Sequence, residues 1–512
     1  MFAWWCSLLL FLHAAAWPYS TYRSSNSQPP QLRINKTGPV DPGLVFLSPS
    51  GRVRPAGLAP LIYDDDGNLV YEGLRGNVGN FRVQQLNGID VITFWTGNMT
   101  APGIGFGSVH ILDMTYTEIY TVSLTGPFVT PDNLIHDSYI DIHESLITPQ
   151  NTILVTAYNA TPYNLISIGG SAKAWVLDSQ FYEIDLRTNQ ILTEWSALED
   201  GNIPLSSSHQ ILGPFDGTRK NPYDAYHINA IEMAKYGFFV SLRHTWSGYY
   251  LFPNGSVRWC VNGKDGGDFT RVGDTNFSWQ HDMRLHNETD HTLVVSLLNN
   301  ANTPTDHQSF TTGMELAIDL TKGTVTGNRS LSDPNDGICS ISQGSYQILN
   351  ETDGHVFIDY GSIAKVKEFD GNGTVVYSAQ FGEDNAVASY RGYRCPWRAI
   401  PFWKPSVMVI RTGTKVTVFM SWNGATDYDN WILYLGTSQT SVEKDEIGMV
   451  MRTGFETAVT LTKPPTRFIQ VVARRGELVL STSETVFFLR SERELEIGIS
   501  VQHLHTFFSA GV

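Results

Sequence analysis

The chain has 512 residues, of which 42% are hydrophobic, 12% aromatic and only 17% charged. Its formal net charge of −15 repels a phosphate backbone, which argues against a nucleic-acid partner. The composition excludes a disordered or coiled-coil chain, and its 45 Gly and 24 Pro favour short strands joined by turns.

Residues 1–16 have the features of a secretory signal peptide. An apolar run from Trp4 to Leu12 is followed by Ala14-Ala15-Ala16, a small-residue cleavage pattern, although no Lys or Arg precedes the run. No run of 18 apolar residues follows it, so we expect no membrane span. Chance predicts roughly four glycosylation sequons in such a chain, but nine occur before residue 380. They are Asn35, Asn98, Asn159, Asn254, Asn276, Asn287, Asn328, Asn350 and Asn372. The sequence therefore predicts a secreted glycoprotein.

Strands and hairpins alternate from residue 40 to residue 404. Runs of β-branched and aromatic residues predict strands at Phe81–Trp95, Ile153–Tyr158, Phe238–Leu242, Leu293–Leu298 and Val356–Tyr360. Hairpins with Asp, Asn or Gly turns are predicted at residues 61–73, 181–195, 249–260, 316–327 and 366–382. One cycle takes roughly 50 to 85 residues, which is typical of a propeller blade of four strands. We therefore predict an all-β fold in which residues 40–404 form a six-bladed β-propeller.

The pattern changes after Pro405. Short strands now follow one another closely, at residues 415–422, 431–436, 455–461, 468–473 and 478–480, without the repeating unit. This predicts a small C-terminal β-sandwich of the fibronectin III or immunoglobulin type over residues 405–490. Residues 17–39 form a leader and residues 491–512 a tail.

Three cysteines remain after the signal peptide, so one intramolecular disulfide at most can form. Cys339 lies shortly before Gln343, and Cys395 lies in the segment that ends at Trp397. Because we expect these two segments at the same end of the propeller channel, we predict that Cys339 pairs with Cys395 and that Cys260 stays reduced.

A histidine recurs at one position of successive repeats. His143 and His227 each precede an apolar strand by about ten residues, as does His281, and Gln343 takes this place in the next repeat. Rotation about a propeller axis brings equivalent positions of the blades together. The three imidazoles are therefore expected to meet at the channel, and Arg243, on the strand after His227, is expected to reach the same centre.

Several kinds of chemistry find no support in the sequence. The chain has no GxxxxGK[ST], HExxH, CxxC or GxSxG motif. Three histidines are able to bind a metal, but the neighbouring Arg243 repels a cation, so we predict no metal. The aromatic residues near these positions are expected in the core; they are Tyr223, Tyr226, Trp246, Trp279 and Trp397.

Tyr226-His227-Ile-Asn229, followed by Ser241-Leu-Arg243-His244, resembles the His-x-Asn and Ser-x-Arg pair of arylsulfotransferases that use no activated nucleotide sulfate. Other segments are similar to the secreted fungal branch of that family: Asp141-x-His143-Glu, Gly263–Phe269, Trp279-Gln-His281-Asp, Ser342-Gln-Gly, Ser389-Tyr-Arg391 and Pro396-Trp397. The resemblance covers residues 40–485. It implies a six-bladed propeller beside a β-sandwich, and transfer of a sulfuryl group between phenols through a sulfated histidine.

The resemblance also implies roles for individual residues. His281 would be the nucleophile, with His227, Asn229 and Arg243 around the sulfuryl oxygens and His143 completing the cluster. Gln343 and Arg391 would bind substrate. The resemblance implies small phenols and aryl sulfates as partners, and no cofactor. The roles are chemically consistent, because a neutral imidazole is a good nucleophile and a guanidinium binds two oxygens in a fixed fork.

Two other classes of function stay open at this point. One is a non-catalytic propeller that binds a ligand or a glycan, with structural histidines, and the other is a metal-dependent oxidase or lyase. The sequence does not indicate the oligomeric state.

Overall fold

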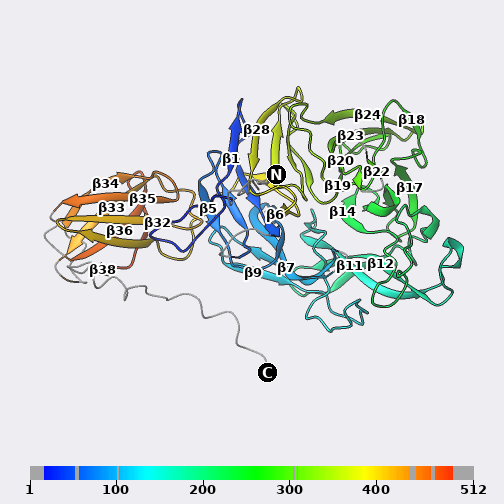
Figure 1. Ribbon diagram of the computed structural model, residues 1–512, viewed down its shortest axis with the longest axis horizontal. Helices are drawn as coiled ribbons and strands as arrows, with labels where there is room; N and C mark the ends of the chain where they lie inside the picture. Colours follow the sequence, from blue (N-terminus) through cyan, green and yellow to red (C-terminus); the bar gives the residue numbers. More distant parts are fainter. Residues whose placement is uncertain are drawn as a thin grey trace, which may run out of the picture.

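The computed structural model describes residues 17–51, 57–100, 103–303, 306–307, 310–436, 438, 445–462 and 467–487 (Figure 1). The predicted signal peptide and the tail at 491–512 lie outside these residues. Within them the protein is all-β, as predicted, with three single turns of 3-10 helix at η1 (Ile166–Ile168), η2 (Leu205–Ser207) and η3 (Arg243–Thr245). No helix in these ranges is long and apolar enough to cross a membrane.

Four sheets in the described residues are each built from one continuous stretch of chain. The first contains β6 (Val78–Leu86), β7 (Ile89–Met99), β8 (Gly105–Leu112) and β9 (Glu118–Val122). The second contains β10 (Ser145–Ile147), β11 (Thr152–Tyr163), β12 (Ala174–Asp185) and β13 (Ile191–Ser196). The third contains β14 (Ile228–Ala234), β15 (Gly237–Leu242), β16 (Ser247–Leu251) and β17 (Val257–Asn262). The fourth contains β18 (Thr270–Val272), β19 (His281–His286), β20 (Thr292–Asn299), β23 (Thr312–Asp319) and β24 (Thr324–Leu331).

Two more sheets combine strands from both ends of this unit. The fifth contains β25 (Ser345–Asn350), β26 (His355–Asp359), β27 (Lys365–Phe369), β28 (Val375–Gln380) and the N-terminal β1 (Arg33–Lys36). The sixth contains β2 (Leu44–Leu47), β4 (Leu61–Tyr63), β5 (Leu69–Glu72) and β30 (Tyr393–Cys395). Small two-stranded pairs join β3 (Pro49–Gly51) to β29 (Val387–Ser389), and β21 (Asn302–Thr303) to β22 (Asp306–His307).

The six sheets surround one centre. Their edge strands β6, β10, β19, β25 and β30 are joined by contacts β6–β10, β19–β25, β25–β30 and β30–β6, and β14 contacts both β11 and β19. The sheets of this closed ring are antiparallel except where β18 pairs in parallel with β24, and the arrangement is consistent with propeller blades. In the sixth sheet β30 pairs with β2 through Leu44 and Cys395, so the two ends of the unit are held together in one sheet.

The chain then forms two further sheets, on the left in Figure 1. One contains β31 (Ser406–Thr412), β32 (Lys415–Ser421) and β35 (Glu456–Thr462). The other contains β33 (Asn430–Gly436), β34 (Asp445–Met451), β36 (Phe468–Arg475), β37 (Leu478–Thr482) and β38 (Val486–Phe487). Both sheets contribute to one buried core that includes Val418, Trp431 and Val471.

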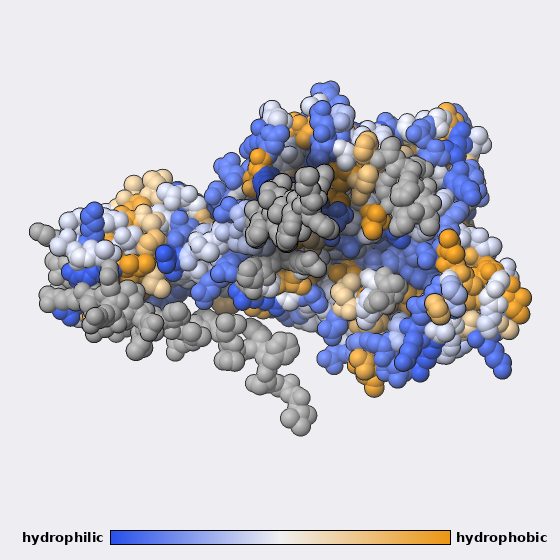
Figure 2. Space-filling model, viewed as in Figure 1, coloured by the Kyte–Doolittle hydropathy of each residue, from blue (hydrophilic) through white to orange (hydrophobic). Residues whose placement is uncertain are grey.

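Contacts between the C-terminal sheets and the larger unit are specific. The Glu72 amide donates to Oδ1 of Asn423 at 2.9 Å, and the hydroxyl of Tyr116 donates to the Gly424 carbonyl at 2.9 Å. Hydrophilic residues cover much of the visible face of both units, with apolar residues in separate patches (Figure 2), as expected for an acidic chain in water.

The predicted disulfide between Cys339 and Cys395 is wrong. Cys395 carries a free thiol on β30, where it is buried with Phe46, Ile62 and Phe81, whereas Cys339 is exposed. A side chain packed into the core of the sixth sheet cannot bridge to a surface loop without moving the strand that carries it. Cys260 is also a free thiol, as predicted.

Seven of the nine sequon asparagines are exposed, while Asn159 and Asn350 are half-buried. Asn159 accepts a hydrogen bond from the Val129 amide at 2.8 Å. Glycosylation and secretion stay predictions.

Candidate functional site

The histidines selected from the sequence stand at equivalent places in successive sheets. His281 begins β19, His227 directly precedes β14, and His143 lies two residues before β10. Gln343 has the same place before β25. His227 and Gln343 have backbone φ angles of +56° and +66°, in the left-handed region that non-glycine residues rarely adopt. Such strained residues concentrate at functional sites.

His143 and His227 face each other, with ring centroids 4.8 Å apart at an angle of 82°. Nδ1 of His143 lies 2.5 Å from a carboxylate oxygen of Asp141, and Nδ1 of His227 lies 2.6 Å from one of Asp224. Because a carboxylate only accepts, both imidazoles carry the proton on Nδ1. Within the described residues no hydrogen bond involves either Nε2. Each of these rings therefore presents an oriented lone pair, as a nucleophile or a general base requires.

His244 stacks on His227 with centroids 4.7 Å apart. Its Nε2 accepts from Nη1 of Arg243 at 3.0 Å, so its Nδ1 carries the proton and donates to the Asp224 carbonyl at 2.7 Å. Asp224, His227 and His244 place ligand atoms within 4.8 Å of one another, as a metal site does. However, these hydrogen bonds use the lone pair of His244 and put a guanidinium beside it, which disfavours a cation here.

His281 is 1% exposed and hydrogen-bonded at both ring nitrogens. Its Nε2 accepts the Gln343 amide at 3.1 Å, and its Nδ1 donates to Oδ1 of Asn300 at 2.8 Å. Burial holds the pKa of His281 well below its ordinary value, and the positive charge of Arg243 lowers it further. His281 is therefore neutral at physiological pH, but its lone pair is occupied by a backbone amide.

Arg243 and Asn229 lie in the same region. Burial lowers the pKa of Arg243 to about 10, so it stays a cation at neutral pH. Nη2 of Arg243 donates to the Ile341 carbonyl at 3.1 Å. Nδ2 of Asn229 donates to the Gln280 carbonyl at 2.7 Å, and its buried Oδ1 has no hydrogen-bond partner in the described part of the chain. The structure thus brings His143, His227 and Arg243 into one cluster with His281.

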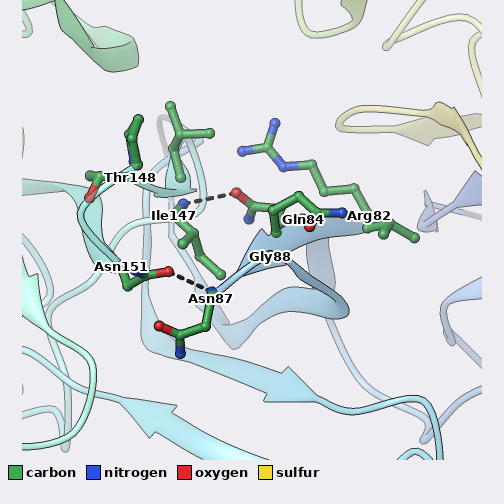
Figure 3. A pocket seen from close by; sticks show the side chains of 11 residues that line it. Arg82, Gln84, Asn87, Gly88, Ile147, Thr148 and Asn151 are labelled. Carbon is green, nitrogen blue, oxygen red and sulfur yellow. Dashed lines mark hydrogen bonds between the residues drawn. The ribbon is translucent and has the colours of Figure 1, made fainter.

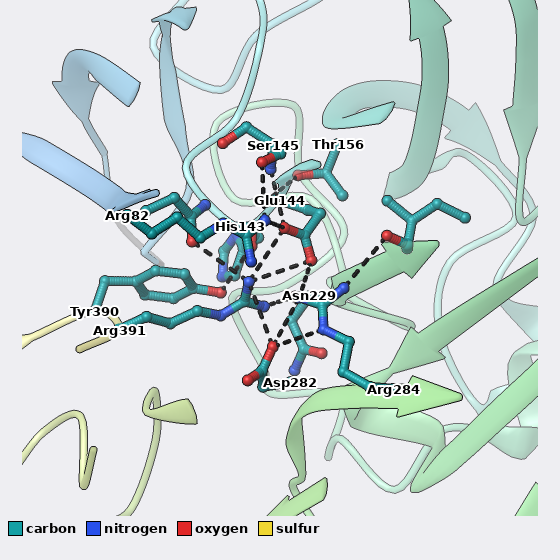
Figure 4. A network of polar contacts seen from close by, with 12 residues as sticks. Arg82, His143, Glu144, Ser145, Thr156, Asn229, Asp282, Arg284, Tyr390 and Arg391 are labelled. Atoms are coloured by element: carbon teal, nitrogen blue, oxygen red, sulfur yellow. Dashed lines mark hydrogen bonds and ion pairs between the residues drawn. The ribbon is translucent and has the colours of Figure 1, made fainter. Parts of the chain in front are cut away.

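A buried network of charges adjoins this cluster (Figure 4). Glu144 pairs with Arg82 at 3.1 Å, with Arg391 at 3.2 Å and with Arg284. Burial by itself raises the pKa of Glu144, but the three arginine charges outweigh it and lower the pKa to about 2. Asp282 accepts from Arg284 at 2.7 Å, so the network holds two carboxylates and three guanidinium groups.

Arg391, predicted to bind substrate, belongs to this network. It is fully buried, and its Nη2 donates to the Asn229 carbonyl at 2.6 Å. Its guanidinium is committed to Glu144 and to this carbonyl, so it supports the backbone of Asn229. Gln343, also predicted to bind substrate, contributes its backbone N–H, which donates to Nε2 of His281, and not its side chain.

A separate cavity of about 550 Å³ lies between β6 and β10 (Figure 3). It is lined by Arg82, Gln84, Asn87, Ile147, Thr148 and Asn151, among others. The Ile147 amide donates to Oε1 of Gln84 at 2.8 Å across it. None of the histidines lines this cavity, so it is not the catalytic candidate.

Sequence reasoning missed the partners that orient the histidines. Asp141 and Asp224 carry a usable signal, because each lies two or three residues before a histidine of the cluster. Asn300 and Arg284 carry none, since their positions depend on how distant strands pack.

Acid should destabilise this protein through His244. Burial lowers the pKa of His244 to about 3, against an ordinary value of about 6.5. Between these values the unfolded chain binds a proton that the folded one does not, so the free energy of unfolding falls as pH falls, by up to about 1.4 kcal/mol per pH unit. We expect urea titrations between pH 7.5 and 5 to show a shallower pH dependence for His244→Gln. Equal slopes in the two proteins would contradict this.

The candidate site is thus a cluster of buried histidines beside Arg243, inside an all-β ring of sheets. A model of the arylsulfotransferase (ASST) family matches residues 82–382, and the chain belongs to this family. No curated protein matches the chain. Among solved structures, one of a GH43_12 protein retrieved from a capybara gut metagenome is similar at 9% identity, covering 88% of this chain and 94% of that one, with a TM-score of 0.25. A structural similarity with so low a TM-score supports no conclusion about the fold or the function of this chain.

Proposed function

We propose that this protein transfers a sulfuryl group from an aryl sulfate to a phenol through a sulfated histidine, without a cofactor. The observation that carries the proposal is the cluster of buried imidazoles from successive sheets beside the cation of Arg243. Membership in the arylsulfotransferase family supports it.

The chemistry divides into two balanced steps. In the first, a histidine Nε2 attacks sulfur, the N–S bond forms and the S–O bond to the donor ring breaks. The donor phenol leaves as its phenolate anion. In the second, the acceptor phenol attacks sulfur, a new S–O bond forms and the N–S bond breaks. The acceptor's proton passes to Nε2 of His143, whose Nδ1–H is held by Asp141, and from there to the phenolate released in the first step. Arg243 binds the sulfuryl oxygens, where negative charge concentrates.

His281 is the nucleophile that the family resemblance implies. In this structure its Nε2 accepts the Gln343 amide, so attack requires that hydrogen bond to be released, and the amide is then available to a sulfuryl oxygen. Nε2 of His227 has no hydrogen bond within the described residues, which makes His227 the second candidate.

The proposal is tested by incubating the purified protein with 4-nitrophenyl sulfate and an excess of phenol. We expect release of nitrophenolate that depends on phenol, together with phenyl sulfate detected by mass spectrometry. Absence of release at any acceptor concentration would instead support a ligand-binding protein.

Arg243→Ala should keep the fold but lower the rate of transfer by roughly 10²- to 10³-fold, the loss typical of removing one oxyanion donor. The loss should appear in kcat, because charge on the oxygens grows in the transition state. Arg243 begins η3, directly after β15, and does not lie on that strand as predicted. Arg258→Ala, an exposed arginine on β17 of the sheet that contains β15, is the matched control and should leave the rate unchanged. Equal rates for both variants would remove Arg243 from the mechanism.

The architecture and processing of the chain are also proposals. The ring of six sheets supports a six-bladed propeller over residues 40–404, and the common core of the last two sheets supports a fibronectin III or immunoglobulin-like sandwich over 405–490. Cleavage after residue 16, secretion, glycosylation and membership in the fungal branch rest on the sequence alone.

A further inference from the structure

Three buried N–H donors beside the histidine cluster have no acceptor within the described residues. They are Nε of Arg243, Nε1 of Trp246 and Nε1 of Trp279. Cζ of Arg243 lies 5.0 Å from the Trp279 ring, and the two indole rings are 5.6 Å apart. Each buried donor without an acceptor costs about 1–3 kcal/mol. Three of them in one place indicate a ligand that supplies the acceptors.

The backbone holds both tryptophans in an unusual conformation. Trp246 has a φ of +52° and Trp279 a φ of +54°, and this left-handed region is rarely adopted by bulky residues. Trp246 caps η3, which starts at Arg243, and Trp279 lies two residues before His281. Trp279 is only 5% exposed, whereas Arg243 and Trp246 are half-buried, so solvent reaches the cluster from their side.

The charges around these N–H donors determine which net charge a ligand can carry. Arg243 is the cation of the cluster, and an indole N–H is a neutral donor at every pH. The carboxylates of Asp141 and Asp224 lie against the neighbouring histidines. A singly charged oxyanion is matched by one guanidinium and two neutral donors, but a dianion would face these carboxylates without a second cation.

We propose that Arg243, Trp246 and Trp279 form a subsite that binds the oxygens of singly charged sulfate esters and sulfonates, and that it discriminates against phosphate monoester dianions. The inference rests on the proposed sulfuryl transfer and adds the two tryptophans to it as positioning residues that set specificity. The sequence favoured a core role for both residues; Trp279 is buried as predicted, whereas Trp246 is only half-buried, and the proposal gives the N–H groups of both a binding role.

The chain supplies a matched control. Nε1 of Trp259 is also buried without an acceptor in the described part of the chain, but Trp259 packs among Phe239, Tyr250 and Phe269, away from the histidines. A Trp→Phe change removes the N–H at each site and keeps most of the aromatic ring.

The test is calorimetric titration with benzenesulfonate, whose C–S bond prevents transfer, and with phenylphosphonate at a pH where it is a dianion. We expect the unaltered protein to bind benzenesulfonate at least roughly tenfold more tightly than phenylphosphonate. Trp246→Phe and Trp279→Phe should each weaken benzenesulfonate binding by roughly tenfold, the loss of one hydrogen bond to a charged group. Trp259→Phe should leave it unchanged.

If Trp246→Phe and Trp279→Phe both bind benzenesulfonate as tightly as the unaltered protein does, the subsite is refuted, since the indole N–H groups would then donate to water only. Equal binding of the two anions would overturn the discrimination. If a variant does not fold, the indole N–H resonances of the unaltered protein must still shift on saturation with benzenesulfonate, and their constancy would also sink the inference. Benzenesulfonate cannot be transferred, so its binding is measured independently of the reaction. If benzenesulfonate binds but no nitrophenolate is released from 4-nitrophenyl sulfate, only the transferase proposal is refuted. If transfer occurs but both Trp→Phe variants leave it unchanged, only the subsite is refuted.

Discussion

Glu144→Ala is expected to lower the free energy of unfolding by about 3–5 kcal/mol, the usual loss when one partner of a buried ion network is removed. Glu144 is fully buried between Arg82, Arg284 and Arg391, and Arg391 is fully buried as well. Without the carboxylate, three guanidinium groups face one another with only Asp282 to balance them. Urea unfolding at neutral pH measures the change.

The network also connects the ring of sheets. Arg82 lies on β6, Glu144 precedes β10, Arg284 lies on β19 and Arg391 precedes β30, so four edge strands meet at one carboxylate. Glu144→Gln keeps the shape and part of the hydrogen bonding, and we expect an intermediate loss. Glu194→Ala, an exposed glutamate on β13, should stay within about 0.5 kcal/mol of the unaltered protein. A Glu144→Ala protein as stable as Glu194→Ala would show that the network contributes nothing net.

The repeated position of the histidines was predictable because it depends only on their spacing in the sequence from the strand that follows. Each imidazole stands at the start of an edge strand, and the spacing to the following apolar strand is visible in the sequence. The all-β fold was predictable for the same reason, since alternation and turn residues are local signals.

The contacts that Asn300 and Arg391 make in and beside the site were not predictable from local signals. Asn300 reaches His281 from the far end of β20, and Arg391 reaches Glu144 across 247 positions of the chain. The failed disulfide has the same origin. The sequence placed Cys395 near Cys339 because it belongs to the segment that ends at Trp397. In the structure the pairing of β30 with β2 decides where the Cys395 side chain packs.

His281→Ala should abolish release of nitrophenolate from an aryl sulfate if His281 carries the sulfuryl group, because no other group then forms the covalent intermediate. His143→Ala should instead retain a slow reaction, since it removes proton transfer, which contributes roughly 10²- to 10⁴-fold. Peptide mass mapping after brief incubation with the donor, without acceptor, should show the added mass on the peptide that contains His281.

His227 is the matched comparison for that experiment. Its Nε2 is not hydrogen-bonded in the described residues and its Nδ1–H is held by Asp224, whereas Nε2 of His281 is occupied by the Gln343 amide. If the added mass appears on the His227 peptide, and His227→Ala rather than His281→Ala abolishes release, the assignment of His281 as nucleophile is wrong. The free lone pair in the resting structure would then mark the attacking nitrogen, and His281, neutral and bonded at both nitrogens, would be a donor-orienting residue.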